Sequence, residues 1–470
     1  MEEIEVTETK KQTNFKQNHW SKKNSANHNV TIQKVNGRAI VLDILMEIQK
    51  SESMSHIVLG NALKKYQYLD KKERNFITKL SQGTIEKRMY LDYCIEQFSK
   101  TPIKKIKPLI KNLLEMSVYQ FLYMDNIPPC AVCNEAVKLA EKRGFKTLKS
   151  YVNGVLRNLA RNIDTIELPV KEKDSIFYYS IKYCLPKWLV QMWIAQYGEE
   201  QFERIAKSFD LPKKTFIRCN TKKVTPDMLR KHLEEEGVTV KSVEGLDYAF
   251  EIEDYDYIAS LQSMRNGEFY IQDISSMFAG EGNIIKRDSY VIDVCAAPGG
   301  KSMNAALKAI DGYVEARDIH SYKVDLIWEN IKRLNLNNIT AKVWDAVDLD
   351  EHAIGKADVV IADLPCSGLG IIGRKPDIKE KMTLQKIKDL VQLQRKILSI
   401  AALYTKVNGI LVYSTCTINK CENDENVEWF TKNYPYQLTE PAIQIFPQEL
   451  AGSIQGGDGF YIARLRRIKG

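Results

Sequence analysis

The chain has 470 residues, of which 44% are hydrophobic and 27% charged, and its formal net charge is +8. This length exceeds one ordinary hydrophobic core, so about two or three domains are expected. No apolar run reaches the roughly 18 residues of a membrane span, which argues against a membrane protein. The mild positive charge fits a nucleic-acid partner, and it fits equally well a dispersed charge that keeps a protein in solution.

The N-terminal segment 1–34 is polar, rich in Asn and Lys, and without the apolar stretch of a secretory signal. We expect a disordered leader there. The nine cysteines are scattered rather than densely paired, which indicates a reducing cytoplasm. Cys130 and Cys133 form one CxxC at the expected start of a helix, and no second pair completes a zinc site, so no metal is expected.

Residues 35–162 are predicted to form an all-α domain. Isoleucines recur every four residues from Ile40 to Ile48, as on the buried face of a helix. Helical spacing returns at 112–125 and 134–143, between the breakers Pro108, Pro128, Pro129 and Gly144.

Residues 163–265 are predicted to form a linker and a small α+β domain. Pro169 and Pro186 mark an irregular stretch that could join two domains. Segment 215–218 is predicted as a strand, and 225–237 as a helix closed by its final glycine.

Residues 266–470 are predicted to form an α/β domain with a Rossmann-like, doubly wound parallel sheet. After Asp288, helical stretches alternate with the short apolar runs VIDV, GYVEA, ITAKV, DVVIAD and GILVYST. Such sheets bind ligands where loops leave the carboxyl ends of the strands. The residues that follow each strand are therefore the candidate site.

The loop after the first of these strands is made mainly of small residues, which allow a cofactor to approach closely: Cys295, Ala296, Ala297, Pro298, Gly299, Gly300 and Lys301. It has neither the GxGxxG of NAD sites nor the GxxxxGK[ST] of nucleoside triphosphate sites, which leaves another adenosine cofactor. Asp318 ends the second strand, where an acidic side chain commonly accepts hydrogen bonds from ribose hydroxyls. Asp345 follows the third strand and either faces the adenine or is an ordinary loop residue.

Two cysteines and a carboxylate follow the fourth and fifth strands. Asp363 ends the fourth strand, Cys366 comes just after it, and Cys416 lies at the end of the fifth. A cysteine in an apolar run is usually a small buried hydrophobic residue, but these two lie just past their strands. Cytosine C5 accepts a methyl group only after a thiolate adds to C6. This covalent catalysis needs an activated cysteine, a group that stabilises charge on the ring, and a route for eliminating the thiol.

With these motifs in place, the chain resembles the Nol/Nop/Sun family of RNA cytosine-5 methyltransferases over nearly its whole length. The motifs that carry the resemblance follow the family's order: VCAAPGGKS at 294–302, ADLPCSG at 362–368, RKPDI at 374–378, YSTCT at 413–417 and GDGF at 457–460. The helical part is similar to a NusB-type RNA-binding domain through RAI at 38–40, IPP at 127–129 and NGVLRN at 153–158.

The resemblance implies S-adenosyl-L-methionine as the cofactor, held by the loop 295–301 together with Asp318, Asp345 and Asp363. It implies that Cys416 is the nucleophile that forms a covalent bond to cytosine C6. Cys366 would help to release the product, and Asp363 would also steady the cytosine ring.

The resemblance also implies residues that shape the RNA site, in the segments FIRCN and YIQDISS and in RKPDI: Arg218, Asn220, Gln272, Asp273 and Arg374. The implied substrate is 16S ribosomal RNA, naked or in early assembly, and the implied enzyme is a cytoplasmic monomer. A cytosine in transfer RNA is the nearest alternative, since the sequence contains no base-reading code.

Two further classes are weighed against this interpretation. A DNA cytosine-5 methyltransferase attacks with the Pro-Cys cysteine of the fourth strand and does not need a residue equivalent to Cys416. A non-enzymatic RNA-binding scaffold is expected to lose Cys416 or the cofactor loop, and both are present.

Overall fold

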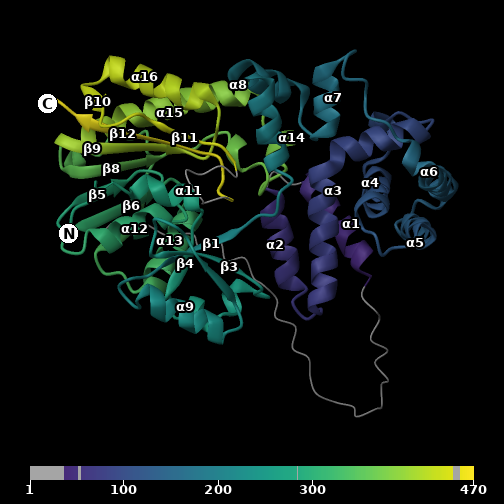
Figure 1. Cartoon of the computed structure of the whole chain (residues 1–470), viewed down its shortest axis with the longest axis horizontal. Coiled ribbons are helices and arrows are strands. Elements are labelled where there is room, and N and C mark those ends of the chain that lie inside the picture. Colours follow the sequence, from purple (N-terminus) through teal and green to yellow (C-terminus); the bar gives the residue numbers. More distant parts are fainter. Residues whose placement is uncertain (1–35, 51–53, 283, 448–455, 470) are drawn as a thin grey trace, which may run out of the picture. The chain divides into compact units, whose positions relative to one another are not determined.

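A computed structural model describes residues 36–50, 54–282, 284–447 and 456–469 (Figure 1). The leader expected at 1–34 lies outside the described residues. The described residues from Gly37 onward form one unit in which the domains contact one another. Within them, no helix has the length and apolar character needed to cross a membrane.

The first domain is helical, as predicted. Its helices are α1 (Gly37–Lys50), α2 (Ser55–Lys65), α3 (Lys71–Phe98), α4 (Pro108–Tyr123), α5 (Pro129–Lys142) and α6 (Lys149–Arg161). The isoleucine stripe from Ile40 to Ile48 is buried, which confirms the predicted face of α1. Asp70 caps α3 by accepting a hydrogen bond from the backbone of Glu73 at 2.8 Å, so the chain turns sharply into this long helix.

Two helices that the sequence did not lead us to expect follow this domain, α7 (Ser175–Lys182) and α8 (Lys187–Ser208). Gly198 interrupts α8 with a φ of +79°, which glycine adopts without strain. The two helices bury Trp193 and Phe202 in a cluster that also contains Leu369 and Ile418 of the last domain. The stretch predicted as a linker is therefore a packed element.

The small α+β domain contains an antiparallel sheet with the strand order β2-β3-β1-β4. Its elements are β1 (Thr215–Cys219), α9 (Pro226–Glu235), β2 (Thr239–Ser242), β3 (Ala249–Glu253), α10 (Gln262–Arg265) and β4 (Phe269–Ile271). Gly237, with a φ of +80°, follows α9 as predicted. The predicted boundary after residue 265 is wrong in one respect, because β4 pairs with β1 and belongs to this sheet.

The last domain is built on a sheet with the strand order β10-β12-β9-β8-β5-β6-β7, with β11 paired to β12. The strands are β5 (Tyr290–Asp293), β6 (Tyr313–Asp318), β7 (Ile339–Val343), β8 (Ala357–Asp363), β9 (Thr405–Thr415), β10 (Tyr436–Leu438), β11 (Ile443–Ile445) and β12 (Phe460–Arg467). From β7 to β9 neighbouring strands are parallel, whereas β12 runs antiparallel to β9. The five apolar runs are thus confirmed as parallel strands.

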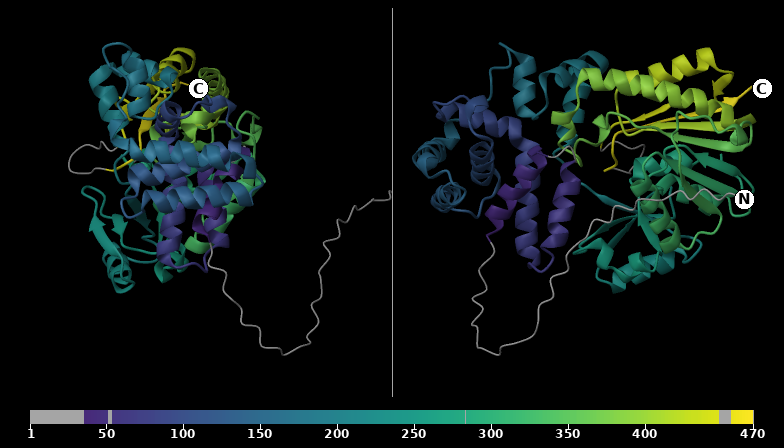
Figure 2. Two further views of the ribbon diagram at one scale, coloured as in Figure 1. Left: turned by 90° about the vertical axis from the view of Figure 1, so that its right-hand side faces the viewer. Right: turned by 180° about the vertical axis from the view of Figure 1, so that it is seen from behind.

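Helices cover both faces of this sheet, as Figures 1 and 2 show. The helices of the domain are α11 (Ile274–Met277), α12 (Gly300–Lys308), α13 (Ser321–Leu334), α14 (Ile378–Lys381), α15 (Leu384–Tyr404) and α16 (Asp424–Asn433). One hydrophobic cluster lies between the sheet and α12 and α13, and a second between the sheet and α15 and α16. Burying both faces explains the apolar runs within the parallel strands.

Candidate active site

The carboxyl ends of β5, β8 and β9 lie side by side, because these strands are parallel neighbours. Their last residues are Asp293, Asp363 and Thr415. Leu364, just past β8, donates its backbone N–H to the carbonyl of Ser414 at 3.1 Å. The loops that carry the predicted catalytic residues therefore leave the sheet at one point.

Cys366 and Cys416 meet at this point, with their Sγ atoms 3.3 Å apart. Both are free thiols, since this separation far exceeds the roughly 2.05 Å of a disulfide bond. Both residues are partly exposed. The contact with the Cys416 sulfur, together with burial, holds the pKa of the Cys366 thiol well above its usual value. Cys366 is therefore a protonated thiol at neutral pH, placed beside a second sulfur.

A buried polar cluster supports the two cysteine loops. The carboxylate of Glu422, which has no exposed surface, accepts hydrogen bonds from the backbone and hydroxyl of Ser367 at 2.8 and 2.5 Å. The hydroxyls of Ser367 and Thr417 lie 2.8 Å apart, and Gln394 donates to Glu422 at 3.1 Å. Burial raises the pKa of Glu422. This cluster could not be predicted from the motifs, because Glu422 and Gln394 lie outside them.

Asp363 is held from two sides. Lys301 Nζ lies 2.7 Å from one of its carboxylate oxygens, and the Ser414 hydroxyl donates to the other at 2.8 Å. Lys301 also donates to the Ser276 hydroxyl at 2.8 Å. A carboxylate fixed in this way beside the two thiols has one orientation to offer a substrate.

The predicted cofactor loop 295–301 joins β5 to the first turn of α12. Gly299 has a φ of +102°, and a Cβ atom at this position would lie 2.6 Å from the Met303 methyl group. Any other residue would be strained here and would also disturb the start of α12. The glycine therefore fixes the path of the loop past the carboxyl end of β5.

Three carboxylates lie at or just past the carboxyl ends of β5, β6 and β7. Asp318 ends β6 and accepts hydrogen bonds from the backbone of His320 at 3.2 Å and Ala297 at 3.4 Å. Asp345 follows β7 and accepts from the Val347 backbone at 3.1 Å. Asp293 ends β5, where it accepts from the Ser302 hydroxyl at 2.6 Å, and burial raises its pKa to about 7. The sequence interpretation missed Asp293, which stands inside the apolar run VIDV.

Gln272 faces the same loop. Its amide group is buried, and neither its oxygen nor its nitrogen has a partner among the described residues. A Cβ atom added at Gly300 of this loop would lie 3.7 Å from the Gln272 amide. An unpaired buried amide costs stability and is common where a ligand completes the hydrogen bonds.

Asp273 and Arg374 pair with each other at the rim of the site, with the guanidinium 3.2 Å from the carboxylate. Arg374 also contacts Asp458 at 2.8 Å and donates to the Lys214 carbonyl at 3.0 Å. Burial raises the pKa of Asp458 to about 7. These side chains join the segments RKPDI, YIQDISS and GDGF.

Arg218 and Asn220 lie elsewhere, which corrects the expectation that they contact RNA. Asn220 has no exposed surface and donates to the carbonyls of Gly267 and Leu334 at 2.8 and 2.9 Å. The Arg218 guanidinium is buried 3.9 Å from the centre of the Tyr248 ring. Both side chains make contacts within the protein interior, and the hydrogen bond from Asn220 to Leu334 joins the small domain to the end of α13.

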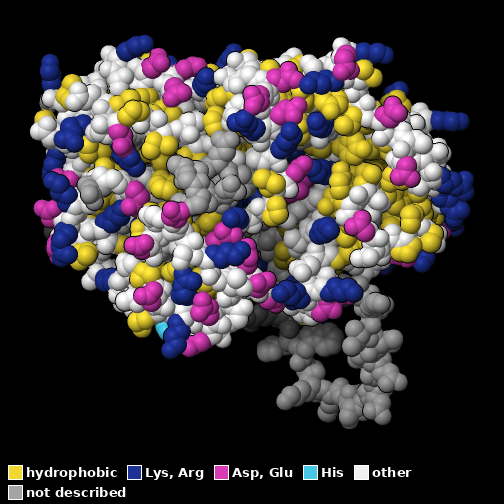
Figure 3. Space-filling model, in the orientation of Figure 1, with side chains coloured by type: hydrophobic (Ala, Val, Ile, Leu, Met, Phe, Trp, Pro, Cys, Tyr) yellow, Lys and Arg dark blue, Asp and Glu magenta, His cyan; other side chains and the backbone are white. Residues whose placement is uncertain are grey.

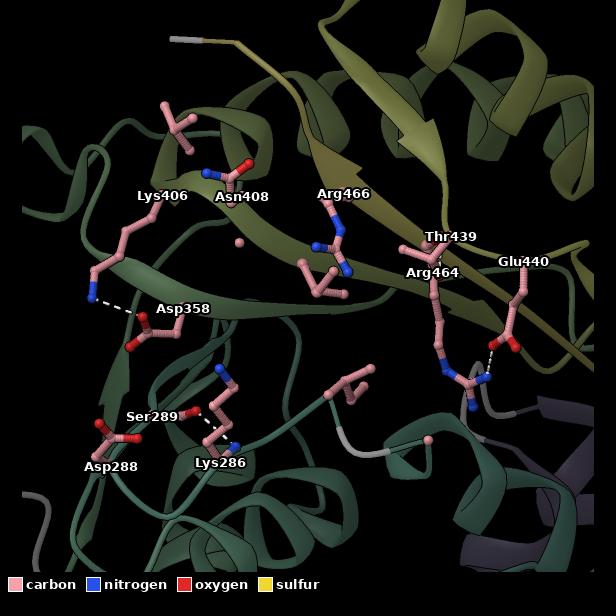
Figure 4. A pocket seen from close by; sticks show the side chains of 15 residues that line it. Lys286, Asp288, Ser289, Asp358, Lys406, Asn408, Thr439, Glu440, Arg464 and Arg466 are labelled. Carbon is pink, nitrogen blue, oxygen red and sulfur yellow. Dashed lines mark hydrogen bonds and ion pairs between the residues drawn. The ribbon is translucent and has the colours of Figure 1, made fainter.

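The cavity drawn in Figure 4, of about 540 Å³, lies at the opposite end of the parallel strands, where their amino ends are. Its walls include residues that precede or begin the parallel strands, such as Ser289 and Asp358. Lys406 pairs with Asp358 at 2.8 Å, and Arg464 pairs with Glu440. This cavity is therefore separated from the cysteines by the length of the strands. Among the described residues, no group of three or more His, Cys, Asp and Glu side chains is arranged to hold a metal ion.

Family models match three parts of the chain. The NusB family matches residues 35–161, a ferredoxin-like domain of RsmF/B-like methyltransferases matches 185–256, and the 16S rRNA methyltransferase RsmB/F model matches 284–466. Their order confirms the expected architecture of a NusB-like helical domain, a small α+β domain and a Rossmann-like methyltransferase domain.

Curated relatives are similar over nearly the whole chain. A probable ribosomal RNA small subunit methyltransferase B of Bacillus subtilis is 34% identical, and the match covers 93% of this chain and 100% of the relative. The corresponding Synechocystis protein is 30% identical, with coverage of 92% and 100%.

Solved structures share the fold. The crystal structure of PH0851 has a TM-score of 0.77 at 24% identity and covers 92% of this chain and 99% of its own. A methyltransferase homolog protein from Pyrococcus horikoshii has a TM-score of 0.55 at 26% identity, and it covers 63% of this chain and 99% of its own.

Proposed function

Because the chain belongs to the RsmB/F family of 16S rRNA methyltransferases, we propose that it transfers a methyl group from S-adenosylmethionine to C5 of a cytosine in 16S ribosomal RNA. The observation that carries the cytosine-C5 chemistry is the pair of thiols, 3.3 Å apart beside a fixed carboxylate. Methyl transfer to a nitrogen or an oxygen needs no such pair, whereas covalent activation of a pyrimidine needs a thiolate and a means of releasing it.

Cys416 is the nucleophile in this proposal. Its thiolate adds to C6 of the cytosine, and the electron pair of the C5–C6 double bond makes C5 nucleophilic. When bound, S-adenosylmethionine supplies the electrophilic methyl group that C5 needs. A base then accepts the C5 proton, the C5–C6 double bond re-forms, and the bond from C6 to the Cys416 sulfur breaks with its electron pair returning to sulfur.

Cys366 and Asp363 assist these steps. The Cys366 thiol lies 3.3 Å from the Cys416 sulfur, so it can donate its proton to that sulfur as the sulfur leaves C6. Asp363, oriented by Lys301 and Ser414, can accept a hydrogen bond from the exocyclic amino group of the cytosine.

The residues around the loop 295–301 fit an adenosine cofactor. Asp318 would bind the ribose hydroxyls, since it ends β6, the neighbour of β5, and Asp345 would face the adenine, since it follows β7 on the far side of β6. The unpaired amide of Gln272 provides a free donor and a free acceptor against the same loop. The methionine end would then lie toward Asp363 and the thiols.

The RNA would present a single cytosine flipped out of a loop or an opened helix, with phosphates held by Lys and Arg. On the face drawn in Figure 3, basic and acidic side chains intermix rather than form one patch. Arg374 and Asp273 would shape the rim of the RNA site through their mutual ion pair. The proposal includes a monomeric enzyme in the cytoplasm, acting on naked or early-assembly RNA.

Methyl transfer from labelled S-adenosylmethionine tests the substrate. We expect label at C5 of cytosine in unmodified small-subunit ribosomal RNA, and no label in bulk transfer RNA or in duplex DNA. The Cys416→Ala variant should be inactive, whereas Cys421→Ala, a matched change at a nearby thiol outside the pair, should be active. Label in transfer RNA alone would overturn the substrate, and activity in Cys416→Ala would overturn the nucleophile.

A further inference from the structure

The segment 366–381, here called the bridging segment, runs from the second cysteine to the end of α14. Near its start, Gly370 donates its N–H to the carbonyl of Cys416 at 3.1 Å, and its own carbonyl accepts from Gly459 at 2.9 Å. A Cβ atom at Gly370 would lie 2.2 Å from the Gly459 carbonyl oxygen and 2.9 Å from that of Cys416. The bridging segment therefore sets the backbone position of the proposed nucleophile.

The other end of the bridging segment is fastened to the helical domain by Asp377. This residue is only 1% exposed, and its two carboxylate oxygens accept hydrogen bonds from the Ser55 hydroxyl at 2.7 Å and the Ser55 backbone at 2.8 Å. Ser55 begins α2, so the carboxylate also lies at the positive end of that helix. Buried charge-assisted hydrogen bonds of this kind hold a fixed geometry.

Two further contacts join the same elements. Lys379, also buried, donates to the carbonyl of Glu86 on α3 at 2.8 Å. Arg88, two residues further along α3, forms an ion pair with Glu380 at 2.8 Å and with the buried Glu115 of α4 at 3.1 Å. The end of the bridging segment is thus held directly to α2 and α3, and through Arg88 it is linked to α4.

The turn after the nucleophile is held from the same side of the protein. Ile418, two residues beyond Cys416, packs in one hydrophobic cluster with Leu369 and Ile378 of the bridging segment and with α7 and α8. On α8, Tyr197 donates to the Ile418 carbonyl, and Gln196 donates to Asn419 at 3.0 Å. Elements outside the methyltransferase domain therefore touch both loops that carry the thiols.

We propose that Asp377 is a positioning residue, through which the helical domain sets the geometry of the paired thiols and so contributes to the chemical step as well as to RNA binding. This inference rests on the proposed role of Cys416. A helical domain that served only as an RNA tether would affect the KM for RNA and leave kcat unchanged. A misplacement of the reacting group by about 1 Å is enough to cost on the order of 100-fold in rate.

The test measures kcat and the KM for small-subunit ribosomal RNA in the full-length protein. Ser55→Ala removes one hydrogen bond to Asp377, and Asp377→Asn disturbs both. We expect kcat to fall about tenfold or more in each variant, with the KM for RNA changed by less than about twofold. Ser55→Thr, which keeps the hydroxyl, should restore most of kcat. The double variant should lose little more than Asp377→Asn, because the two side chains act as one unit.

Asp256→Asn is the matched control. It breaks the ion pair between Arg74 of α3 and Asp256 of the small domain, which spans 2.9 Å and is solvent-exposed at the aspartate. This contact joins the helical domain to the rest of the protein without touching the bridging segment, so both constants should stay at wild-type values. Thermal unfolding of each variant, with the assays run well below its Tm, separates a positioning effect from loss of folded protein. If Asp377→Asn does not fold, Ser55→Ala decides the result alone.

Failure of the role proposed for Asp377 can be distinguished from failure of the proposed function. Wild-type kcat in Ser55→Ala and Asp377→Asn, or a rise in KM alone, would overturn the role of Asp377 while Cys416→Ala remained inactive. Full activity in Cys416→Ala would instead overturn the proposed function itself.

Discussion

The parallel strands of the large sheet have amino ends and carboxyl ends, here called the amino edge and the carboxyl edge, and polar side chains have different surroundings at the two. At the amino edge, charges neutralise one another, as in the pairs Lys406–Asp358 and Arg464–Glu440. At the carboxyl edge, burial or close contact raises the pKa of Asp293 and Cys366, and the amide of Gln272 is unpaired. Such groups destabilise a fold unless they serve a ligand or a reaction, so their concentration at one edge locates the site.

The largest effect is expected from Lys301→Met, which removes the cation from Asp363 at the carboxyl edge. The carboxylate would lose its fixed orientation, and kcat should fall by about 100-fold or more. Methyl-transfer kinetics measure the loss. Lys308→Met is the control, because Lys308 lies on the same helix and pairs with Glu281 at 2.9 Å instead. Equal losses in the two variants would mean that α12, rather than Asp363, is the sensitive element.

A smaller effect, on stability rather than rate, is expected from Asn220→Ala. This change leaves two buried carbonyls without their donor and should lower the free energy of unfolding by about 1–3 kcal/mol. The KM for RNA should stay at its wild-type value. Denaturant unfolding of Asn220→Ala beside Asn337→Ala, an exposed asparagine in the same region, measures the cost. A raised KM with unchanged stability would restore Asn220 as an RNA contact.

The pH dependence of stability should depend on Asp293. Burial raises its pKa in the folded protein to about 7, above the usual 3.8, so the folded state binds this proton more tightly than the unfolded chain does. Its contribution to stability is full below about pH 4 and is lost as the pH rises toward 7. Between about pH 4 and 7, the free energy of unfolding should decline less in Asp293→Asn than in wild type. Parallel curves for the two proteins would contradict the account.

The smallest effect is expected at the amino edge itself. Lys406→Ala breaks a pair in which both side chains are more than a third exposed, at 46% and 37%. Exposed pairs of this kind contribute about 0–1 kcal/mol, so stability and methyl transfer should hardly change. A marked loss of activity in this variant would show that the two edges are not as different as their contacts indicate.

Much of the fold could be predicted because the parallel strands are buried on both faces and therefore appear as continuous apolar runs. Helices α7 and α8 were missed because Pro169, Pro186 and the charges between them resemble a linker. The order of the motifs predicted the residues at the carboxyl ends of the parallel strands. It could not show that Arg218 and Asn220 are buried whereas Arg374 is partly exposed. That difference depends on packing between distant segments. For the same reason, no local pattern pointed to Glu422, and the motif RKPDI contained Asp377 without indicating its contact with Ser55.

The most direct test of the account is to look for a covalent protein–RNA adduct. The Cys366→Ala variant, incubated with S-adenosylmethionine and unmodified small-subunit ribosomal RNA, should accumulate an adduct that survives denaturing electrophoresis, because the Cys416 sulfur is no longer helped to leave C6. The double variant Cys366→Ala with Cys416→Ala should form none, and peptide mapping should place the attached nucleotide on Cys416. An adduct that persists in the double variant, or that maps to another residue, would contradict the assignment of Cys416 as the nucleophile.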